Sequence, residues 1–251
     1  MNNIIELNLE NIEKEHICCA ISDKKGENRV KSKKDWLKDR IKEGLVFAKL
    51  DIRGKVFIEY IPGEHAWAPI EADGYMYINC FWVSGKYKGK GNADKLLNYC
   101  IEDAKRKNKK GLVVLSSETK KPFLSDPKHL KYKGFKVSDK AKPYYELLYY
   151  PFDESYEKPR FKEHVKDGVI NTKGWTLYYS NQCPHTEKYA LKLVEEEKKK
   201  GINIDMIKIT DKEKAQNAPN PFTTYSLFYE GEFITNEILT EKSFEKLLGN
   251  I

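Results

Sequence analysis

Hydrophobic and polar residues alternate in two stretches of the first half, 45–51 and 55–61, which Arg53 and Gly54 separate. Alternation with a period of two is typical of strands with one buried face, and a glycine between two such stretches favours a tight turn. We therefore predict an antiparallel hairpin. The segment 75–83 is aromatic and apolar almost throughout, which predicts a strand covered on both faces.

A helical pattern follows that strand. Apolar residues from Ala93 to Ala104 recur at intervals of three and four, as on the buried stripe of an amphipathic helix. We end this helix at Gly111, and the β-branched run 112–117 then predicts a strand parallel to 75–83. Strand, glycine-containing loop, helix and strand together predict a βαβ unit.

Weaker patterns precede the hairpin. The apolar residues of 4–7 predict a short strand, and the isoleucines of 12–21 predict a helix. Ser32 followed by Asp35 resembles a capping box, so a second helix is predicted to begin at Ser32 and to place Trp36 on its apolar face.

The second half carries its own series of elements. A strand at 144–152 ends the first half, and the charged stretch 153–173 is predicted to be a linker. Beyond it we predict strands at 175–179, 202–209, 226–229 and 233–238, a helix that starts near Pro184 and a final helix around 244–248. The fold class is therefore α/β, with one domain at 1–152 that has a mixed sheet and flanking helices, and a smaller α/β domain at 174–251.

Composition narrows the class of protein. Hydrophobic residues at 40% and charged residues at 33% of the 251 positions are typical of soluble globular proteins. No run of 18 apolar residues and no secretory signal is visible in the sequence. The five cysteines include the adjacent pair Cys18 and Cys19, which does not fit a disulfide framework. We expect a cytoplasmic protein with reduced thiols that does not bind a membrane.

The net charge of +7 predicts a surface that attracts anions, whether nucleic acid, a membrane face or a phosphorylated small molecule. Many of the lysines, as in 105–110 and 198–200, fall in predicted helices and are typical of solvated helix faces. Because no helix-turn-helix, zinc or RNA-binding pattern is present, nucleic acid binding is the weakest hypothesis and is not expected.

The segment 82–97 places Gly89 and Gly91 between a buried strand and the clearest helix. Free amides, the positive end of the helix dipole and neighbouring lysines suit a pyrophosphate at such a loop. An ordinary strand-to-helix turn with solvated lysines is the alternative. The spacing fits neither the P-loop GxxxxGK[ST] nor the dinucleotide fingerprint GxGxxG.

This segment resembles the acetyl-CoA loop of the GNAT superfamily, where an apolar strand ending in Val is followed by Arg/Gln-x-x-Gly-x-Gly/Ala and a helix. Here Lys86-Tyr87-Lys88-Gly89-Lys90-Gly91 follows Val83, and a lysine stands where Arg or Gln is usual. The family's downstream signature, a Lys shortly before a Gly-Phe that enters a strand, is similar to Lys-Tyr-Lys-Gly-Phe at 131–135. The resemblance covers residues 1 to about 150.

The resemblance implies an N-acetyltransferase with acetyl-CoA as donor, an amine that attacks the thioester directly, and no metal. It also implies that strand 75–83 splays from 112–117, which leaves a cleft for the pantetheine arm, and that main-chain groups polarise the thioester carbonyl. The acceptor, the acyl chain length and the oligomeric state stay open, and a homodimer is compatible with the sequence. The resemblance assigns the following positions to the donor: Phe81, Trp82, Val83, Lys86, Tyr87, Lys88, Gly89, Lys90, Gly91, Asn92, Ala93 and Ser116.

The catalytic side chains follow less directly from the resemblance. Many members of the family place a Tyr acid four residues before the downstream Gly, where this sequence has Leu130, and a Glu base where it has Tyr77. The candidates are Tyr132 or His129 as the acid and Glu71 or Asp73 as the base, with a water chain as the alternative base.

Cys183 stands before the predicted helix near Pro184, where the helix dipole favours the thiolate. The segment resembles the Cys-x-x-Cys corner of thioredoxin-like proteins, but Thr186 replaces the second cysteine, which excludes dithiol exchange within this motif. The whole second half resembles the YoaP-like domain that follows some bacterial GNAT domains. Two hypotheses remain for it: a binding, covering or dimerising module, or a catalytic Cys183. The second makes the chain a monothiol redox or thiol-binding protein with a CoA-sensing first half.

Overall fold

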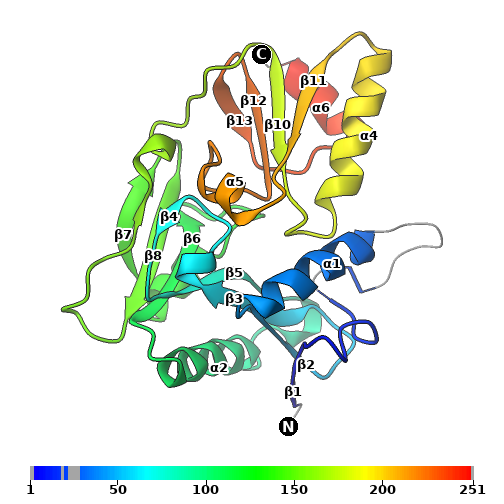
Figure 1. Ribbon diagram of the computed structural model, residues 1–251. Helices are drawn as coiled ribbons and strands as arrows, with labels where there is room; N and C mark the ends of the chain where they lie inside the picture. The colour runs from blue at the N-terminus through cyan, green and yellow to red at the C-terminus, as the bar shows by residue number, and fades with distance from the viewer. Residues whose placement is uncertain (1–2, 18–19, 22–28, 250–251) are drawn as a thin grey trace.

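A large and a small sheet with flanking helices, which we call the first and second modules, make up most of the chain, and a third sheet has only two strands (Figure 1). The computed structural model describes residues 3–17, 20–21 and 29–249, so Cys18 and Cys19 lie outside the described residues. The first module contains β1 (Ile4–Glu6), α1 (Arg29–Lys42), β2 (Val46–Leu50), β3 (Val56–Pro62), β5 (Met76–Val83), α2 (Asn92–Arg106), β6 (Gly111–Ser117), α3 (Pro127–Tyr132), β7 (Lys136–Ala141) and β8 (Tyr145–Pro151). The second contains β10 (Trp175–Tyr179), α4 (Thr186–Lys199), β11 (Ile204–Lys208), α5 (Lys212–Gln216), β12 (Tyr225–Tyr229), β13 (Glu232–Thr235) and α6 (Glu241–Leu248).

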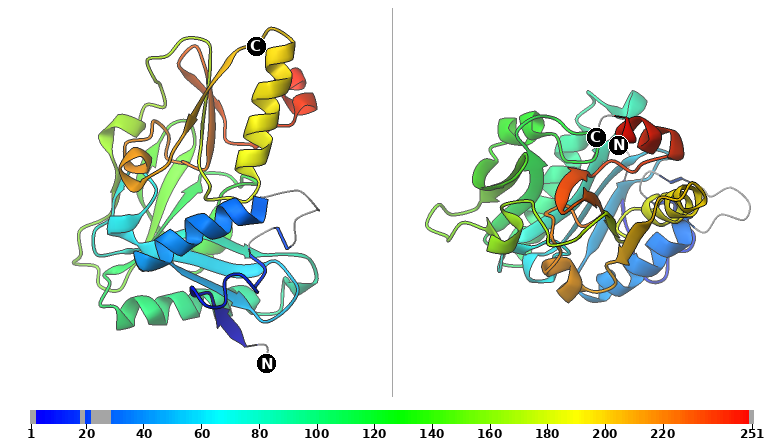
Figure 2. Two further views of the ribbon diagram at one scale, coloured as in Figure 1. Left: turned by 45° about the vertical axis from the view of Figure 1, so that its right-hand side comes forward. Right: turned by 90° about the horizontal axis from the view of Figure 1, so that it is seen from above.

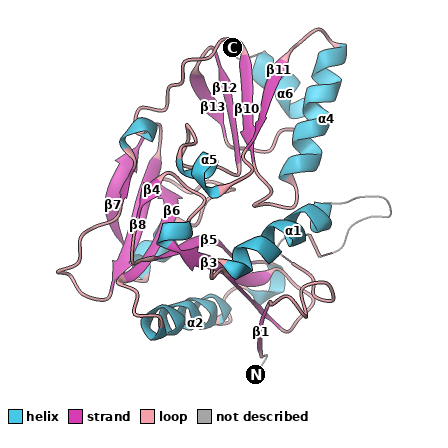
Figure 3. Cartoon of the chain, in the orientation of Figure 1, coloured by secondary structure: helices cyan, strands magenta, loops and turns pink. Residues whose placement is uncertain are grey.

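The large sheet is mixed and has the strand order β1-β2-β3-β5-β6-β8-β7. β2 and β3 form the predicted hairpin, and β5 and β6 are the parallel pair of the predicted βαβ unit. α1 and α2 cover opposite faces of this sheet (Figure 3). Accordingly, Leu37 of α1 and Leu97 of α2 belong to two separate buried clusters. The predicted α/β class with a mixed sheet and flanking helices is confirmed.

Two predicted helix starts are wrong. The described part of 12–21 forms turns rather than a helix, because Asn8 Oδ1 accepts the amides of Glu10 and Asn11 and turns the chain there. Ile12 is fully buried, so the isoleucine spacing reflected core contacts of an irregular segment. α1 begins at Arg29, so Ser32 is not its cap; the Ser32 hydroxyl instead donates to Glu187 of the second module.

The predicted end of α2 is also too late. The helix ends at Arg106, and Gly111 is the first residue of β6. A Cβ at Gly111 would lie 2.3 Å from Tyr150 O of β8, so only glycine allows the two strands to pair this closely.

β5 pairs with β6 only from Met76 to Ile78, after which the two strands part. The register between β3 and β5 shifts at this point, where Asn79 is the extra residue of a β-bulge. The first half of β5 is buried, but its second half is partly exposed. The prediction of a strand covered on both faces therefore holds only up to Ile78.

The charged stretch 153–173 is folded against both modules. It contains β9 (Arg160–Phe161), which pairs with β4 (Ile70–Glu71), and Phe161 is buried in the core of the first module. Farther on, the Ile170 amide donates to Gly231 O of the second module at 2.9 Å. The predicted linker is therefore not a free tether, while the predicted module boundaries stay predictions.

The small sheet has the order β11-β10-β12-β13, with β10 parallel to β11 and antiparallel to β12. The order of strands and helices predicted for the second half is present, with the short α5 in addition. The thioredoxin-like description of this module stays a prediction.

The second module packs on the face of the large sheet that also carries α1 (Figure 2). Ala215 and Ala218 are buried in the core cluster of the first module. The buried Tyr145 hydroxyl of β8 donates to Asn220 Oδ1 at 2.9 Å and also to Asn236 Oδ1. Apolar packing and buried hydrogen bonds together fix the second module on this face.

Candidate active site

The loop between β5 and α2 holds its backbone open. Gly89 and Gly91 have φ of 70° and 71°, a region that glycine occupies without strain, and a Cβ at either position would meet no atom within 4 Å. Gly91 is the N-cap of α2, and no side chain caps that helix. The first amides of α2 therefore have neither an intrahelical partner nor a capping side chain, as an anion site requires.

Three lysines surround these amides. Lys86, Lys88 and Lys90 are exposed, and within the described residues no carboxylate pairs with any of them. Free amides and unpaired positive charges at one helix N-terminus form a donor set that fits the diphosphate of CoA. The assignment of this loop to the donor, including the amide of Ala93 in the first turn of α2, stays a prediction.

Two predicted donor contacts hold the loop instead. Asn92 Nδ2 donates to Tyr87 O at 2.9 Å, and the Tyr87 ring lies where a side chain at Gly54 would stand. Both side chains thus anchor the loop to α2 and to the β2–β3 turn. Their assignment to the donor stays a prediction.

Ser116 is a further correction. It is fully buried on β6, and its hydroxyl donates to Ser125 O at 2.7 Å. The hydroxyl therefore holds the loop before α3 and cannot also bind the donor.

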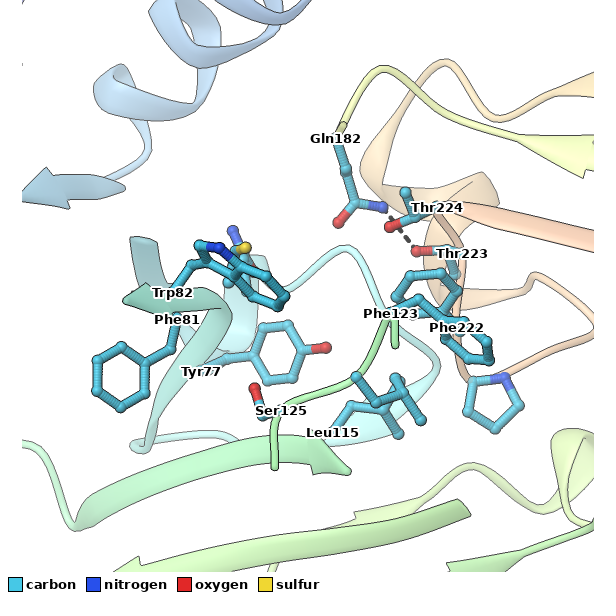
Figure 4. Close-up of a pocket in the computed structure, with 14 residues that line it drawn as sticks. Tyr77, Phe81, Trp82, Leu115, Phe123, Ser125, Gln182, Phe222, Thr223 and Thr224 are labelled. Carbon is cyan, nitrogen blue, oxygen red and sulfur yellow. Dashed lines mark hydrogen bonds between the residues drawn. The ribbon is translucent and has the colours of Figure 1, made fainter. Parts of the chain in front are cut away.

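A pocket opens where β5 and β6 part, and both modules line it (Figure 4). We call it the inter-module pocket; its cavity volume is about 50 Å³, and the empty space that it shares with open solvent is about 490 Å³. The first module contributes Tyr77, Asn79, Phe81, Trp82, Leu115, Phe123 and Ser125, among others. The second module contributes Gln182, Pro221, Phe222, Thr223 and Thr224. The predicted donor residues Phe81 and Trp82 thus line it, whereas Val83 pairs with Val56 at the end of β5.

The pocket is uncharged, since none of its lining residues carries an ionisable acid or base other than a phenol or a thiol. Burial raises the pKa of Tyr77, and its hydroxyl has no hydrogen-bond partner in the described part of the chain. Tyr77 therefore stays protonated at neutral pH and can donate a hydrogen bond into the pocket, but cannot act as a base there.

A buried ion pair lies behind one wall of the pocket. Lys33 Nζ of α1 is 2.8 Å from Glu59 Oε2 of β3, and both side chains are almost completely buried. Asn79 Nδ2 donates to Glu59 Oε1 at 3.1 Å, while Asn79 Oδ1 is buried without a hydrogen-bond partner. The carboxylate therefore fixes which way the Asn79 amide is turned.

The structure separates three predicted catalytic residues from the pocket. Tyr132 on α3 is 82% exposed. Glu71 is exposed and paired with Arg160, and Asp73 is exposed in the turn before β5. None of the three lines the pocket. They were predicted from their short distance along the sequence to Tyr77 or Gly134, and that distance does not show in which direction each chain segment turns.

His129 is better placed than Tyr132. Its ring centroid lies 6.1 Å from that of Phe81 on the splayed end of β5. Its Nε2 is buried, and the described residues offer it no hydrogen-bond partner. Asp126 caps α3 by accepting the amides of Lys128 and His129, which fixes where the imidazole lies.

Cys183 lies half-buried in the loop before α4 and is not among the residues that line the pocket, although its neighbour Gln182 is. α4 begins at Thr186, whose hydroxyl donates to Cys183 O at 2.9 Å. Thr186 therefore occupies a structural position at the helix start. The described cysteines Cys80, Cys100 and Cys183 are not joined in disulfides.

Sequence comparisons agree with this arrangement. The family model described as "Acetyltransferase (GNAT) family" matches residues 9–122, and the one described as "YoaP-like" matches residues 203–246. The chain is 45% identical over 247 residues to the protein described as "Uncharacterized N-acetyltransferase YoaP" of Bacillus subtilis (strain 168), and 98% of each chain is covered. The chain therefore belongs to the GNAT acetyltransferase family and carries a YoaP-like domain. It is an acyltransferase with acetyl-CoA as its donor.

Two solved structures from Escherichia coli are also similar in part. The ribosomal-protein-S18-alanine N-acetyltransferase has a TM-score of 0.41 and 14% identity, over 62% of this chain and 97% of that chain. The GNAT family N-acetyltransferase YhbS in complex with CoA has a TM-score of 0.38 and 12% identity, over 66% and 92%.

Two kinds of feature do not occur in the described residues. No group of three or more His, Cys, Asp or Glu side chains with metal-binding geometry is found among them. No helix in the same part of the chain is both long and apolar enough to cross a membrane.

Proposed function

We propose that the chain transfers the acetyl group of acetyl-CoA to a primary amine that binds in the inter-module pocket, by direct attack on the thioester. The observation that carries this proposal is the gap between β5 and β6 beyond Ile78. Residues of β5 beside this gap line the uncharged pocket, and β5 continues directly into the glycine loop. A donor held at its diphosphate by the loop would extend its arm along the gap toward an acceptor in the pocket.

The reaction needs little from the protein beyond alignment and hydrogen bonds. The amine nitrogen forms a bond to the carbonyl carbon, the carbonyl oxygen takes up negative charge, and the carbon–sulfur bond then breaks. Along an antiparallel ladder, alternate amides point away from the partner strand. Amides of β5 beyond Ile78 that point away from β3 thus find no partner in β6, so they can stabilise the oxygen.

Two protons must move in this reaction. We assign His129 Nε2 as the donor to the departing thiolate, because it is buried without a partner beside the splayed end of β5. The amine gives up its own proton to water, since no carboxylate or imidazole lines the pocket among the described residues.

Glycine substitutions in the loop test donor binding. Replacing Gly89 or Gly91 with Val puts a β-branched residue at a positive φ and distorts the loop that would hold the diphosphate, so the KM for acetyl-CoA should rise by about 10-fold or more, while the KM for the amine changes little. Gly201→Val is the matched control. Gly201 also has a positive φ, and a Cβ there would meet no atom within 4 Å, but it lies at the end of α4.

The readout is steady-state kinetics with acetylated product quantified by mass spectrometry, joined to calorimetric titration with acetyl-CoA. An unchanged KM in both loop variants, or an equal rise in Gly201→Val, would contradict the loop assignment. Absence of heat on titrating the folded wild-type protein with acetyl-CoA would contradict the proposal as a whole.

A further inference from the structure

Two side-chain amides on opposite walls of the inter-module pocket are held in the same way. Asn79 belongs to the first module and Gln182 to the second. Asn79 Nδ2 donates to Glu59, and Gln182 Nε2 donates to Ser180 Oγ at 3.0 Å and Thr223 Oγ1 at 2.7 Å. Each nitrogen is thus fixed by an acceptor behind the wall of the pocket.

The oxygens of these amides have no such partner. Asn79 Oδ1 is buried without a hydrogen bond, and among the described residues no donor contacts Gln182 Oε1 either. Figure 4 shows the Gln182 nitrogen directed at Thr223 and its oxygen turned away from Thr223, toward the space above Tyr77. The buried, unpaired oxygen of Asn79 has a free-energy cost, which a ligand that donates N–H groups removes.

The remaining walls are apolar or aromatic. Tyr77 and Trp82 line one side, and Phe123 and Phe222 lie with ring centroids 5.5 Å apart across the contact between the modules. Such walls favour an uncharged aromatic or aliphatic body and disfavour a carboxylate, which would lose its hydration without gaining a positive partner.

We infer that the YoaP-like module forms one wall of the acceptor site, and that Asn79 Oδ1 and Gln182 Oε1 together bind the N–H groups of a primary amine on an uncharged, aromatic or apolar small molecule. This inference rests on the proposed function and specifies its acceptor. Two neutral oxygens orient the amino group and leave its nitrogen lone pair free for attack. The module thereby selects the acceptor, and Cys183 takes no part in it.

The ion pair between Lys33 and Glu59 acts through Asn79. The Glu59 carboxylate keeps the Asn79 nitrogen away from the pocket, and Lys33 balances the buried charge. Glu59 is therefore a positioning residue, and Glu59→Gln, which can turn either end of its amide toward Asn79, should weaken amine binding without weakening donor binding.

The test compares tyramine with tyrosine, which differs from it by a carboxylate, as acceptors for the full-length protein at saturating acetyl-CoA. We expect kcat/KM for tyramine to exceed that for tyrosine by at least about 10-fold. Gln182→Met removes the whole amide at nearly constant size, both the oxygen and the nitrogen that donates to Ser180 and Thr223, and should raise the KM for tyramine by roughly 3- to 10-fold, with the KM for acetyl-CoA unchanged. Asn79→Leu should act in the same way.

Gln216→Leu is the matched control. Gln216 Nε2 donates to Ala66 O at 3.2 Å across the module contact but does not line the pocket, so its loss loosens the same contact without removing a pocket oxygen. We expect it to leave the KM for tyramine within about twofold of the wild-type value. If the Asn79→Leu variant does not fold, the Gln182→Met variant still tests the inference, because Gln182 lies outside the large sheet.

Three results would overturn the inference and leave the proposed function intact. These are an unchanged KM for tyramine in Gln182→Met, an equal rise in Gln216→Leu, and acetylation of tyrosine, spermidine or glucosamine in preference to tyramine and benzylamine. A wild-type protein that binds acetyl-CoA but acetylates none of these amines would instead contradict the proposed function.

Discussion

The ionisable side chains in the inter-module pocket and beside β5 differ in whether they can donate or accept a proton. The Tyr77 phenol stays protonated because burial raises its pKa, and no carboxylate lines the pocket in the described part of the chain. His129, by contrast, has a buried ring nitrogen that no described residue contacts. At the residue scale, His129 is therefore the proton donor that we propose for the leaving thiolate.

Replacing His129 with Gln tests this role. We expect kcat to fall by about 100-fold or more, because the thiolate then leaves without a proton donor, while the KM for acetyl-CoA stays within about threefold. His65→Gln, outside the pocket, should have wild-type kinetics. A His129→Gln enzyme with at least half the wild-type kcat would remove His129 from the mechanism.

Short elements set the geometry of these side chains. The β-bulge at Asn79 redirects the strand where β5 leaves β6, so that the Asn79 amide reaches both Glu59 and the pocket wall. α3 is six residues long and begins with Pro127, whose fixed φ suits the first helical position. Such a short helix depends on its cap, here Asp126.

Removing that cap should affect both stability and catalysis. Asp126→Ala leaves the amides of Lys128 and His129 without an acceptor, so we expect the free energy of unfolding to fall by about 1 kcal/mol and kcat to fall several-fold as His129 loses its fixed position. Asp126→Asn retains a capping oxygen and should keep most of both. Urea unfolding and steady-state kinetics measure the two effects, and equal behaviour of the Ala and Asn variants would contradict the role of the cap.

On the scale of the whole molecule, the two modules share buried contacts and several buried phenols. Burial raises the pKa of Tyr75 from 10.0 to about 12, and it does the same for Tyr144 at the module contact. The folded state favours the neutral phenol more than the unfolded state does. The contribution of these phenols to the free energy of unfolding is therefore fully present below pH 10 and is lost as the pH rises toward 12.

We therefore expect the free energy of unfolding to fall steeply between pH 10 and 12, with both modules unfolding in one transition. Tyrosinate absorbance at alkaline pH, recorded with circular dichroism, measures this. Tyr75→Phe should make the fall with pH shallower, whereas Tyr132→Phe, at an 82% exposed position, should not change it. Stability independent of pH over this interval would show that these phenols ionise freely.

The sequence by itself determined the features that depend on neighbours along the chain. Period-two alternation identified the β2–β3 hairpin, the apolar stripe identified α2, and the spacing of Gly89 and Gly91 identified the loop that we propose for the donor, because strand pleat, helix turn and glycine conformation are local properties. The sequence around Cys183 predicted a functional position in the second module, but the residue of this segment that lines the pocket is Gln182.

Only the tertiary structure brings together the residues of the proposed acceptor site. Tyr77, Asn79 and Gln182 belong to two modules and meet because the second module packs over the gap between β5 and β6. The sequence also did not show how Ser116 and Tyr132 are oriented. The Ser116 hydroxyl is buried and donates a hydrogen bond to Ser125 O, whereas Tyr132 faces solvent. Residue type and spacing do not encode which way a side chain points across a module contact; packing does.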